Sequence, residues 1–501
     1  MKKLLLEVVV FVCGALVMVF EMVGARVLGP WVGTSLFVWT SLIGIILGSL
    51  SLGYWLGGKL ADKKPDAKVF GYIILLSGLS ILFTWLIKDP FLRILSRHIF
   101  DIRKVAIISS LLLFAPGSIF LGMVSPYAVK LKLESLKQSG RTVGNLYAIS
   151  TIGSIAGTFG AGFFLIPAIG TNKIILVIAG ILLFIAFLIF VLNKRFFNAL
   201  ISAAIVAYIG VIGNAAGRAT PSYVDVDTLY NRVLIYNTTD RETGKEIKIL
   251  KINDERSAAV FLDSDDLVFE YLKYYHLAAH FKPDMKKALM IGGSAYTYPR
   301  DFLKRYPEAS IDVVEIDPDL TQLAKKYFGL REQPRLGIIH EDGRTFLNRS
   351  DKKYDVIFMD AFRSQFTVPY QLTTLECVRK QYDMLNAGGV VVANIISSLD
   401  GRSNLFLQAQ SKTYRAVFPQ VYYFAVKDPE EKNYFQNIMI VALKDSRKPE
   451  MASSDSMMNV FLSHRVDLNI GNDVPVLTDD YAPVEYYAVR SLGAYLSMYG
   501  D

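Results

Sequence analysis

Small and acidic residues follow short apolar runs in the second half of the chain. Gly292, Gly293 and Ser294 follow the run that ends at residue 291, and their small side chains allow a tight turn and close approach of a ligand. Glu315 comes 23 residues after Gly292, where a carboxylate can accept both hydroxyls of a ribose. The full G-x-G-x-x-G pattern is absent, so this loop alone is a weak signal.

Two further acids extend the pattern. Asp342-Gly343 follows the next apolar run, a place from which an acidic side chain and a bare backbone can reach a base. Asp360 follows the run after that, where a reacting group would lie. Each acid alone is also explained as a helix N-cap or a turn residue. Three acids after three successive runs favour a site for a nucleotide or for a nucleoside that carries a sulfonium group.

The runs that precede these residues are typical of strands buried on both faces, with helices between them. Since strands that alternate with helices form parallel sheets, we predict a doubly wound α/β sheet with a site beyond the carboxyl ends of its strands. Residues 421–426 and 437–443 lack a clear helix between them and are predicted to pair antiparallel. The predicted parallel strands are 288–291, 311–316, 337–340, 356–359 and 390–396, with helices near 299–306, 318–328 and 371–386.

The first part of the chain has a different pattern, with seven apolar runs long enough to cross a bilayer as helices. They are 4–27, 35–57, 69–87, 105–128, 143–169, 174–192 and 196–213. Within 143–169, Gly153, Gly157 and Ala161 repeat at four-residue spacing, which lets helix backbones approach closely. We predict a multi-domain protein: a transmembrane bundle of six or seven spans at 1–215, a small β unit and connecting helix at 216–285, and a Rossmann-like domain at 286–501.

Charge is distributed unevenly. Residues 1–215 carry 19 Lys/Arg against 7 Asp/Glu, and the rest of the chain carries 35 against 39. The basic residues of the first part cluster at every second connection, which by the positive-inside rule places the N-terminus in the cytoplasm of a multi-pass protein of the cell membrane. Connection 88–104 is also basic and is predicted to lie along the interface. The bilayer, and not a nucleic acid, is the partner that this distribution predicts.

The side of the α/β domain depends on run 196–213. If that run crosses the membrane, seven crossings place the domain outside the cell. If it lies in or on the membrane without crossing, the domain is cytoplasmic. The three acids after the apolar runs favour the cytoplasmic alternative, because they are hard to explain without a nucleoside ligand, and that ligand is expected inside the cell.

Two residue types argue against other site classes. Only two cysteines, Cys13 and Cys377, are present, which excludes a disulfide framework. His276 and His280 are four residues apart on a helical stretch, but a third ligand is not evident. No metal site is predicted, and the two histidines are expected to pack or lie on a helix surface.

Several motifs resemble the spermidine synthase family, which has the fold of S-adenosylmethionine-dependent methyltransferases with a small β domain before it. The motifs are ALMIGG (288–293), VVEIDP (313–318), HEDGR (340–344), YDVIFMD (354–360) and NAGGV (386–390). The first part resembles the membrane bundle fused to such domains, on GYWLGG (53–58) with Asp62 and on Tyr147, Gly153 and Gly157. The tail LTDDYAPVE (477–485) extends the likeness to nearly the whole chain.

The resemblance implies roles for the candidate residues. S-adenosylmethionine or its decarboxylated form is the implied donor, and Asp360 would help an attacking amine to lose its proton. The residues implied to bind the donor are Gly292, Gly293, Ser294, Glu315, Asp342 and Gly343.

Departures from the family pattern bear on the acceptor. The family carries an acid in the glycine loop where this chain has Ser294 and Ala295, and residues 269–271 do not match its Tyr-His-Glu stretch. A second acid of the family aligns with Arg363, which would repel a polyamine cation and suit an acceptor with a carboxylate or phosphate, such as a lipid headgroup.

Three functions remain open. The first is a membrane-embedded transferase for an unknown small-molecule or lipid acceptor, with methyl transfer favoured over aminopropyl transfer. The second is a genuine polyamine (spermidine) aminopropyltransferase. The third is a catalytically degenerate binding or assembly module on a membrane bundle. The sequence leaves the oligomeric state open.

Overall fold

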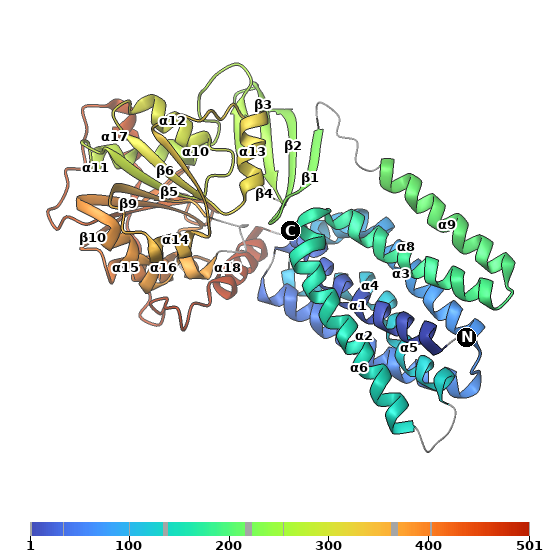
Figure 1. The fold of residues 1–501 in the computed structure, drawn as a ribbon. Helices are drawn as coiled ribbons and strands as arrows, with labels where there is room; N and C mark the ends of the chain where they lie inside the picture. Colours follow the sequence, from blue (N-terminus) through green and yellow to red (C-terminus); the bar gives the residue numbers. More distant parts are fainter. Residues whose placement is uncertain are drawn as a thin grey trace. The chain divides into compact units, whose positions relative to one another are not determined.

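The structure, a computed structural model, describes residues 3–33, 35–99, 101–133, 139–215, 223–253, 255–361, 369–400 and 403–499. The chain divides into two compact units, Met1–Thr220 and Pro221–Asp501 (Figure 1).

The described residues of the first unit are helical apart from short connections. Its helices are α1 (Lys3–Val32), α2 (Leu36–Lys63), α3 (Ala67–His98), α4 (Ile102–Leu113), α5 (Ala115–Lys132), α6 (Ser139–Gly160), the π-helical turn η2 (Ala161–Leu165), α7 (Ile166–Ala168), α8 (Thr171–Leu192) and α9 (Phe196–Ala215). Within the described residues, five stretches are long and apolar enough to cross a membrane: α1, α2, α3, α6 with its extension to residue 168, and α8.

The apolar run predicted at 105–128 is two helices, α4 and α5, bent by 49° at Phe114. Pro116 lies in the first turn of α5, and its nitrogen cannot donate the hydrogen bond that would join this turn to α4. The hydroxyl of Thr84 donates to the carbonyl oxygen of Leu113, the last residue of α4, at 2.5 Å. If the bent pair counts as one span, six stretches can cross, and Phe196–Ile209 of α9 is classed as a shorter apolar helix.

Helix α3 corrects one expectation. Residues 88–104 were expected to form a connection along the interface, but α3 continues without a break to His98. Lys88 is buried and pairs with Asp89 at 2.7 Å, so an ion pair stabilises the helix where the sequence indicated a basic connection.

Glycines bring α1 and α6 into backbone contact. A Cβ atom added at Gly153 would lie 2.1 Å from the carbonyl oxygen of Phe11, and one at Gly157 would lie 2.2 Å from that of Ala15. This confirms the packing role predicted for the small residues at four-residue spacing.

The second unit begins with a four-stranded antiparallel sheet of order β1-β2-β3-β4. Its strands are β1 (Tyr223–Asp227), β2 (Arg232–Thr239), β3 (Glu246–Ile252) and β4 (Glu255–Phe261). Val233, Ile235 and Leu250 of this sheet form one core with Ala295 and Leu320 of the α/β part. The small sheet therefore packs beside the glycine loop.

The larger sheet has eight strands in the order β12-β10-β11-β9-β8-β5-β6-β7. Strands β5 to β9 pair in parallel, whereas β10, β11 and β12 pair antiparallel. The strands are β5 (Lys287–Ile291), β6 (Ser310–Glu315), β7 (Leu336–His340), β8 (Tyr354–Met359), β9 (Leu385–Ser397), β10 (Gln420–Ala425), β11 (Gln436–Leu443) and β12 (Arg465–Val466).

Helices cover both faces of this sheet (Figure 1). Met290 belongs to one buried core while its neighbours Leu289 and Ile291 belong to the other, as expected of strands buried on both faces. The remaining helices are α10 (Glu270–Tyr274), α11 (Leu277–Phe281), α12 (Thr297–Arg305), α13 (Pro318–Tyr327), α14 (Gly343–Arg349), η3 (Tyr370–Leu372), α15 (Leu375–Met384), α16 (Leu405–Arg415), α17 (Ser456–Ser463) and α18 (Val484–Tyr499). The predicted fold class, a helical bundle followed by a small β unit and a Rossmann-like domain, is confirmed.

Candidate active site

A strained loop leads from β5 into α12. Gly292 has a φ of +96°, and a Cβ atom added there would lie 2.4 Å from the carbonyl oxygen of Asp360. Ser294 and Tyr296 also have positive φ angles, 47° and 58°. Left-handed backbone is costly for residues with a side chain and persists where the surrounding contacts hold it. The loop is therefore fixed in one shape beside the end of β8.

Glu315, the last residue of β6, holds this loop from the neighbouring strand. Its Oε2 atom accepts hydrogen bonds from the N–H groups of Gly293 and Ser294, both at 2.9 Å. Its Oε1 atom accepts one from the N–H group of Asp317 at 3.0 Å. Burial raises the pKa of Glu315, and these three bonds oppose that rise. Because a carboxylate offers about four lone-pair positions, Glu315 retains capacity for a ribose hydroxyl.

Asp342 is the N-cap of α14. Its Oδ1 atom accepts hydrogen bonds from the N–H group and the hydroxyl of Thr345, at 3.0 and 3.3 Å. A Cβ atom added at Gly343 would lie 2.6 Å from Cγ2 of Ile291, so this pair lies against the end of β5. The capping alternative thus applies to Asp342, and its role toward a base stays a prediction.

Asp360 follows β8, and both of its carboxylate oxygens accept hydrogen bonds. Oδ1 accepts from Nδ2 of Asn394 at 3.1 Å, and Oδ2 accepts from the hydroxyl of Tyr271 at 3.3 Å. Burial raises the pKa of Asp360 to about 6, while bonds from Asn394, Tyr271 and Tyr275 act in the opposite direction. A carboxyl group with this pKa is mostly ionised at neutral pH and is basic enough to take up a proton.

Backbone hydrogen bonds join the strand ends at this edge of the sheet. The N–H group of Asp360 donates to the carbonyl oxygen of Ile291, and that of Gly292 to Val314, both at 2.9 Å. The structure brings together these predicted site residues: Gly292, Gly293, Ser294, Glu315, Asp342, Gly343 and Asp360. Arg363, the remaining predicted residue, lies outside the described residues.

Three side chains around Asp360 were missed by the sequence reasoning. Tyr271 belongs to α10, Tyr275 follows it, and Asn394 belongs to β9. One signal was available, because Asn394 is the only polar residue in the predicted strand 390–396. A polar side chain inside a buried strand needs a hydrogen-bonding partner, which here is the carboxylate of Asp360.

The tail motif contacts α14 and the start of α15. Nη2 of Arg344 donates to Oδ2 of Asp479 at 2.7 Å, and the hydroxyl of Thr374 donates to Oδ1 at 2.7 Å. The N–H group of Leu375 donates to the carbonyl oxygen of Leu477, also at 2.7 Å. Because Arg344 is two residues from Asp342, the tail segment holds the start of α14 in place.

The two histidines pack, as expected. His276 is buried and contacts Asp301 through Nε2 at 2.8 Å and the hydroxyl of Tyr306 through Nδ1 at 2.9 Å. Nε2 of His280 contacts the backbone carbonyl oxygen of Glu450. Within the described part of the chain, no group of three His, Cys, Asp or Glu side chains could hold a metal ion.

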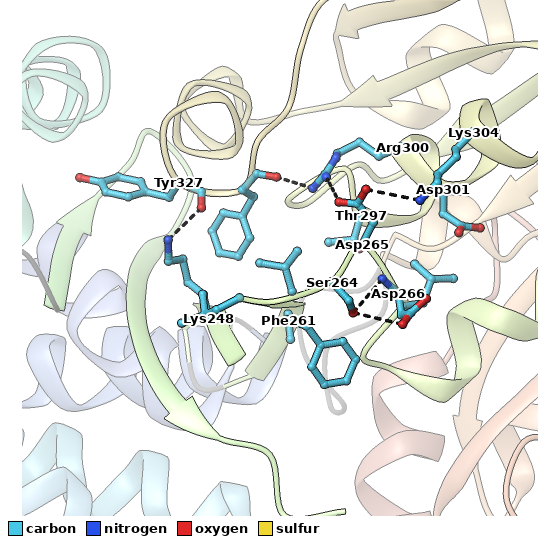
Figure 2. A pocket seen from close by; sticks show the side chains of 15 residues that line it. Lys248, Phe261, Ser264, Asp265, Asp266, Thr297, Arg300, Asp301, Lys304 and Tyr327 are labelled. Atoms are coloured by element: carbon cyan, nitrogen blue, oxygen red, sulfur yellow. Dashed lines mark hydrogen bonds and ion pairs between the residues drawn. The ribbon is translucent and has the colours of Figure 1, made fainter. Parts of the chain in front are cut away.

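A cavity of about 260 Å³ lies between the small sheet, α12 and the end of α13, lined by 15 residues that do not include the three strand-end acids (Figure 2). Lys248 donates to the carbonyl oxygen of Tyr327, and Arg300 donates to that of Phe328. These cations cap the C-terminal end of α13, where backbone carbonyls lack helical partners. Two of the cavity's cationic side chains are therefore explained by the fold.

Comparison with known proteins matches the same region. Residues 269–452 match the spermine/spermidine synthase domain family. A polyamine aminopropyltransferase of Vibrio vulnificus is 28% identical over 41% of this chain and 67% of its own length. A probable polyamine aminopropyl transferase of Bifidobacterium longum is 27% identical, over 53% of this chain but only 62% of its own length.

One relative extends beyond the second unit. Polyamine aminopropyltransferase 1 of Streptomyces coelicolor is 23% identical over 72% of this chain and 69% of its own length, more than residues 221–501 can supply. Among solved structures, a probable spermidine synthase from Corynebacterium glutamicum is 23% identical, with 52% of this chain and 97% of that chain covered and a TM-score of 0.43. A spermidine synthase from Thermotoga maritima is 19% identical, with 45% and 73% covered and a TM-score of 0.34.

Proposed function

Because the protein is spermidine synthase-like, with residues 269–452 as its matching domain, we propose that it is a membrane-embedded transferase that moves an aminopropyl group from decarboxylated S-adenosylmethionine to an amine. One observation carries the proposal. Glu315, Asp342 and Asp360 lie at the carboxyl ends of three parallel strands, β6, β7 and β8, and β5 with its glycine loop lies between β8 and β6. Glu315 and Asp360 both contact this glycine loop. The names of the curated relatives, polyamine aminopropyltransferases, support the aminopropyl group as cargo.

The residues at this edge fit an adenosyl donor. Glu315 would accept a ribose hydroxyl, and the segment at Asp342 and Gly343 would contact the base. Gly292 and Gly293 allow the donor chain to approach the backbone beside Asp360. In this arrangement the sulfonium end of the donor would lie toward Asp360, the predicted catalytic carboxylate.

The chemistry asks for alignment and the removal of one proton. Asp360 takes a proton from the ammonium form of the acceptor, and the free amine attacks the donor carbon next to sulfur. A C–N bond forms while the C–S bond breaks, and the electron pair of that bond leaves with sulfur as a neutral thioether. No acid is needed for this leaving group.

Methyl transfer is the second candidate, and a specific observation favours it. Ser294 and Ala295 stand where the resembling family carries an acid in the glycine loop, so this chain lacks that negative charge near the donor. The released nucleoside distinguishes the two reactions, because aminopropyl transfer yields methylthioadenosine and methyl transfer yields adenosylhomocysteine.

The proposed location is the cell membrane, with the α/β domain in the cytoplasm. Five candidate spans and one bent pair return the chain to the side of its N-terminus, which the basic connections assign to the cytoplasm. Helix α9 would then lie along the interface, preceded by Lys194 and Arg195. This side of the membrane is also the one that supplies the donor.

The experiment uses the full chain purified in detergent. Mass spectrometry of co-purifying small molecules, followed by turnover assays with each donor, identifies the cargo. Asp360→Asn should abolish turnover, whereas Asp351→Asn, an exposed acid after α14, should leave it unchanged. Absence of turnover and of bound nucleoside with both donors would leave the degenerate binding module as the function.

The acceptor is proposed to be anionic, either a small molecule or a lipid headgroup, since Arg363 takes the place of an acid in the resembling family. Loss of the guanidinium in Arg363→Ala should lower turnover of an acceptor with a carboxylate or phosphate by about tenfold or more. Amines without a carboxylate or phosphate should be used at least as well by the variant, because the guanidinium that repels their ammonium form is gone. Equal activity of the variant on the anionic acceptor would contradict this role for Arg363.

A further inference from the structure

Two amide side chains connect the candidate base to a distant strand. Nδ2 of Asn437 donates to Oδ1 of Asn394 at 2.9 Å, and Nδ2 of Asn394 donates to Oδ1 of Asp360 at 3.1 Å. The three residues come from β11, from β9 and from the end of β8, which are adjacent in the sheet. Asn437 is therefore linked to Asp360 through Asn394 without touching it.

Strand register explains why these side chains meet. Met359 pairs with Ala393, so Asp360 and Asn394 are the next residues along β8 and β9. On the other side of β9, Asn394 pairs with Met439 and Ile396 with Asn437. Asn437 is thus a diagonal neighbour of Asn394 on the same face, a spacing that polar side chains can bridge.

The direction of the hydrogen bonds has an electrostatic consequence. Asn394 is 4% exposed, so its amide depends on protein partners. While Asn437 donates to its oxygen, Asn394 presents its NH₂ group to the carboxylate. If the amide turned over, its oxygen would face the oxygen of Asp360, an arrangement that disfavours the ionised carboxylate.

We propose that Asn437 is a positioning residue for the reaction proposed above: by holding the amide of Asn394, it keeps Asp360 ionised and oriented to accept a proton. The inference rests on the proposed function for its catalytic meaning. The bond geometry that carries it belongs to the protein alone.

Few other groups act on this carboxyl. Among the described residues, the side chains that influence its ionisation are Asn394 from β9 and Tyr271 and Tyr275 from the α10 segment. Both tyrosines have pKa values raised well above the ordinary value, by burial and by Asp360, so they remain neutral donors. Among the described residues, Asn394 is then the one amide that donates to the Asp360 carboxylate, and Asn437 donates the hydrogen bond that holds the Asn394 amide.

The test measures the ionisation of Asp360 directly in the full chain in detergent. The infrared carbonyl band of a protonated carboxyl group is followed through a pH titration, and the spectrum of Asp360→Asn is subtracted to isolate this residue. Asn437→Leu keeps the volume but removes the donor. Asn437→Asp keeps the shape and polarity, and its carboxylate draws the NH₂ group of Asn394 away from Asp360.

We expect a titration midpoint near 6 in the parent protein. It should rise by about one pH unit in Asn437→Leu and by more in Asn437→Asp. Without the bond from Asn437 the Asn394 amide can turn over and withdraw its hydrogen bond from the Asp360 carboxylate, and loss of one hydrogen bond to a charged group changes the ionisation equilibrium roughly tenfold. The acid limb of the kcat profile should move with it, while the KM for the donor stays constant. Asn437→Asp keeps the test decisive if the Leu variant fails to fold.

Asn386→Leu is the matched control. Nδ2 of Asn386 donates to Asp355 at 2.8 Å, so the same residue types meet on the same two strands at their opposite ends. This variant should leave the midpoint of Asp360 unchanged. Equal midpoints in the parent protein and both Asn437 variants would overturn the inference. If the midpoint shifts in the Asn437 variants but the protein shows no turnover, the proposed function is refuted, whereas the effect of Asn437 on Asp360 through Asn394 is supported.

Discussion

At the residue scale, a single carboxylate has a structural role in the fold and is also predicted to bind a ligand. Glu315 fixes the glycine loop through three backbone donors, yet it is also the residue predicted to accept the ribose hydroxyls. The interpretation of Glu315 as a turn residue and its predicted role in binding are therefore compatible. The loop is shaped by the same side chain that would meet the ligand.

Replacement of Glu315 by Gln should weaken donor binding by about 10- to 100-fold, because an amide accepts at one atom only and loses the charge-assisted bonds. Calorimetry with methylthioadenosine as the probe measures the change. Glu341→Gln is a suitable control, since Glu341 lies nearby but pairs with Arg349. Binding that is equal in both variants would show that Glu315 only shapes the loop.

Asp360 differs from Glu315, because its burial lowers the stability of the fold. Burial raises the pKa of Asp360, which suits a proton acceptor but makes the ionised carboxylate costly in the folded state. Its folded-state pKa of about 6 lies above the ordinary 3.8, so the folded state takes up a proton more readily than the unfolded state. This group therefore stabilises the fold at low pH, and that contribution is lost as the pH rises through 6.

Asp360→Asn should accordingly raise the melting temperature of the full chain above pH 6, by a few degrees. The difference from the parent protein should shrink as the pH falls from 6 to about 4. Scanning fluorimetry across this pH range checks the trend. A variant that is less stable than the parent at pH 8 would contradict the assignment of a raised pKa.

At the element scale, the turn from β5 into α12 lies between Glu315 and Asp360 and contacts both residues. Gly292 is required there for two separate reasons: its positive φ, and the 2.4 Å that would separate a Cβ atom from the backbone of Asp360. Gly388, in β9, also has a positive φ, but nothing lies within 4 Å of the position of an added Cβ atom there.

Gly292→Ala should therefore destabilise the second unit by about 2–4 kcal/mol, whereas Gly388→Ala should cost about 1 kcal/mol. Denaturant titration followed by tyrosine fluorescence measures both. The alanine at 292 should also abolish binding of methylthioadenosine under conditions where the protein is folded. Equal destabilisation by the two variants would mean that the loop yields to the added methyl group.

The elements that could be predicted from the sequence are those with local signals. The strands 288–291 and 356–359 are short apolar runs with small or acidic residues after them, and each lies within a strand of the structure. The contacts around Asp360 lack such a signal, because Tyr271 and Asn394 reach it from 89 and 34 residues away. They depend on which strands become neighbours, which periodicity does not encode.

The membrane unit shows the same limit. The run 105–128 satisfied the length and apolarity of one span, but Pro116 divides it, and the angle between α4 and α5 depends on tertiary contacts such as that of Thr84 with Leu113. Conversely, the basic residues at 88–98 indicated a connection, whereas the structure continues α3 through them.

At the scale of the whole molecule, the side of the membrane decides whether the enzymatic proposal is feasible. A green fluorescent protein fused after Asp501 should fluoresce, and an alkaline phosphatase fused there should be inactive, because the six proposed crossings would return the chain to the cytoplasm. Deletion of 196–215 should leave both readouts unchanged if α9 does not cross. Active phosphatase with the intact chain would place the α/β domain outside and remove its source of donor.

The bond between Arg344 and Asp479 also sets an order of assembly. A ribosome synthesises the membrane helices first and Asp479 only after every other residue of the strand-end site. The bond between Arg344 and Asp479 can therefore form only when translation is almost finished. By then the helices of the first unit have already emerged from the ribosome. Under the proposed membrane location, the first unit therefore enters the lipid before the strand-end site is complete.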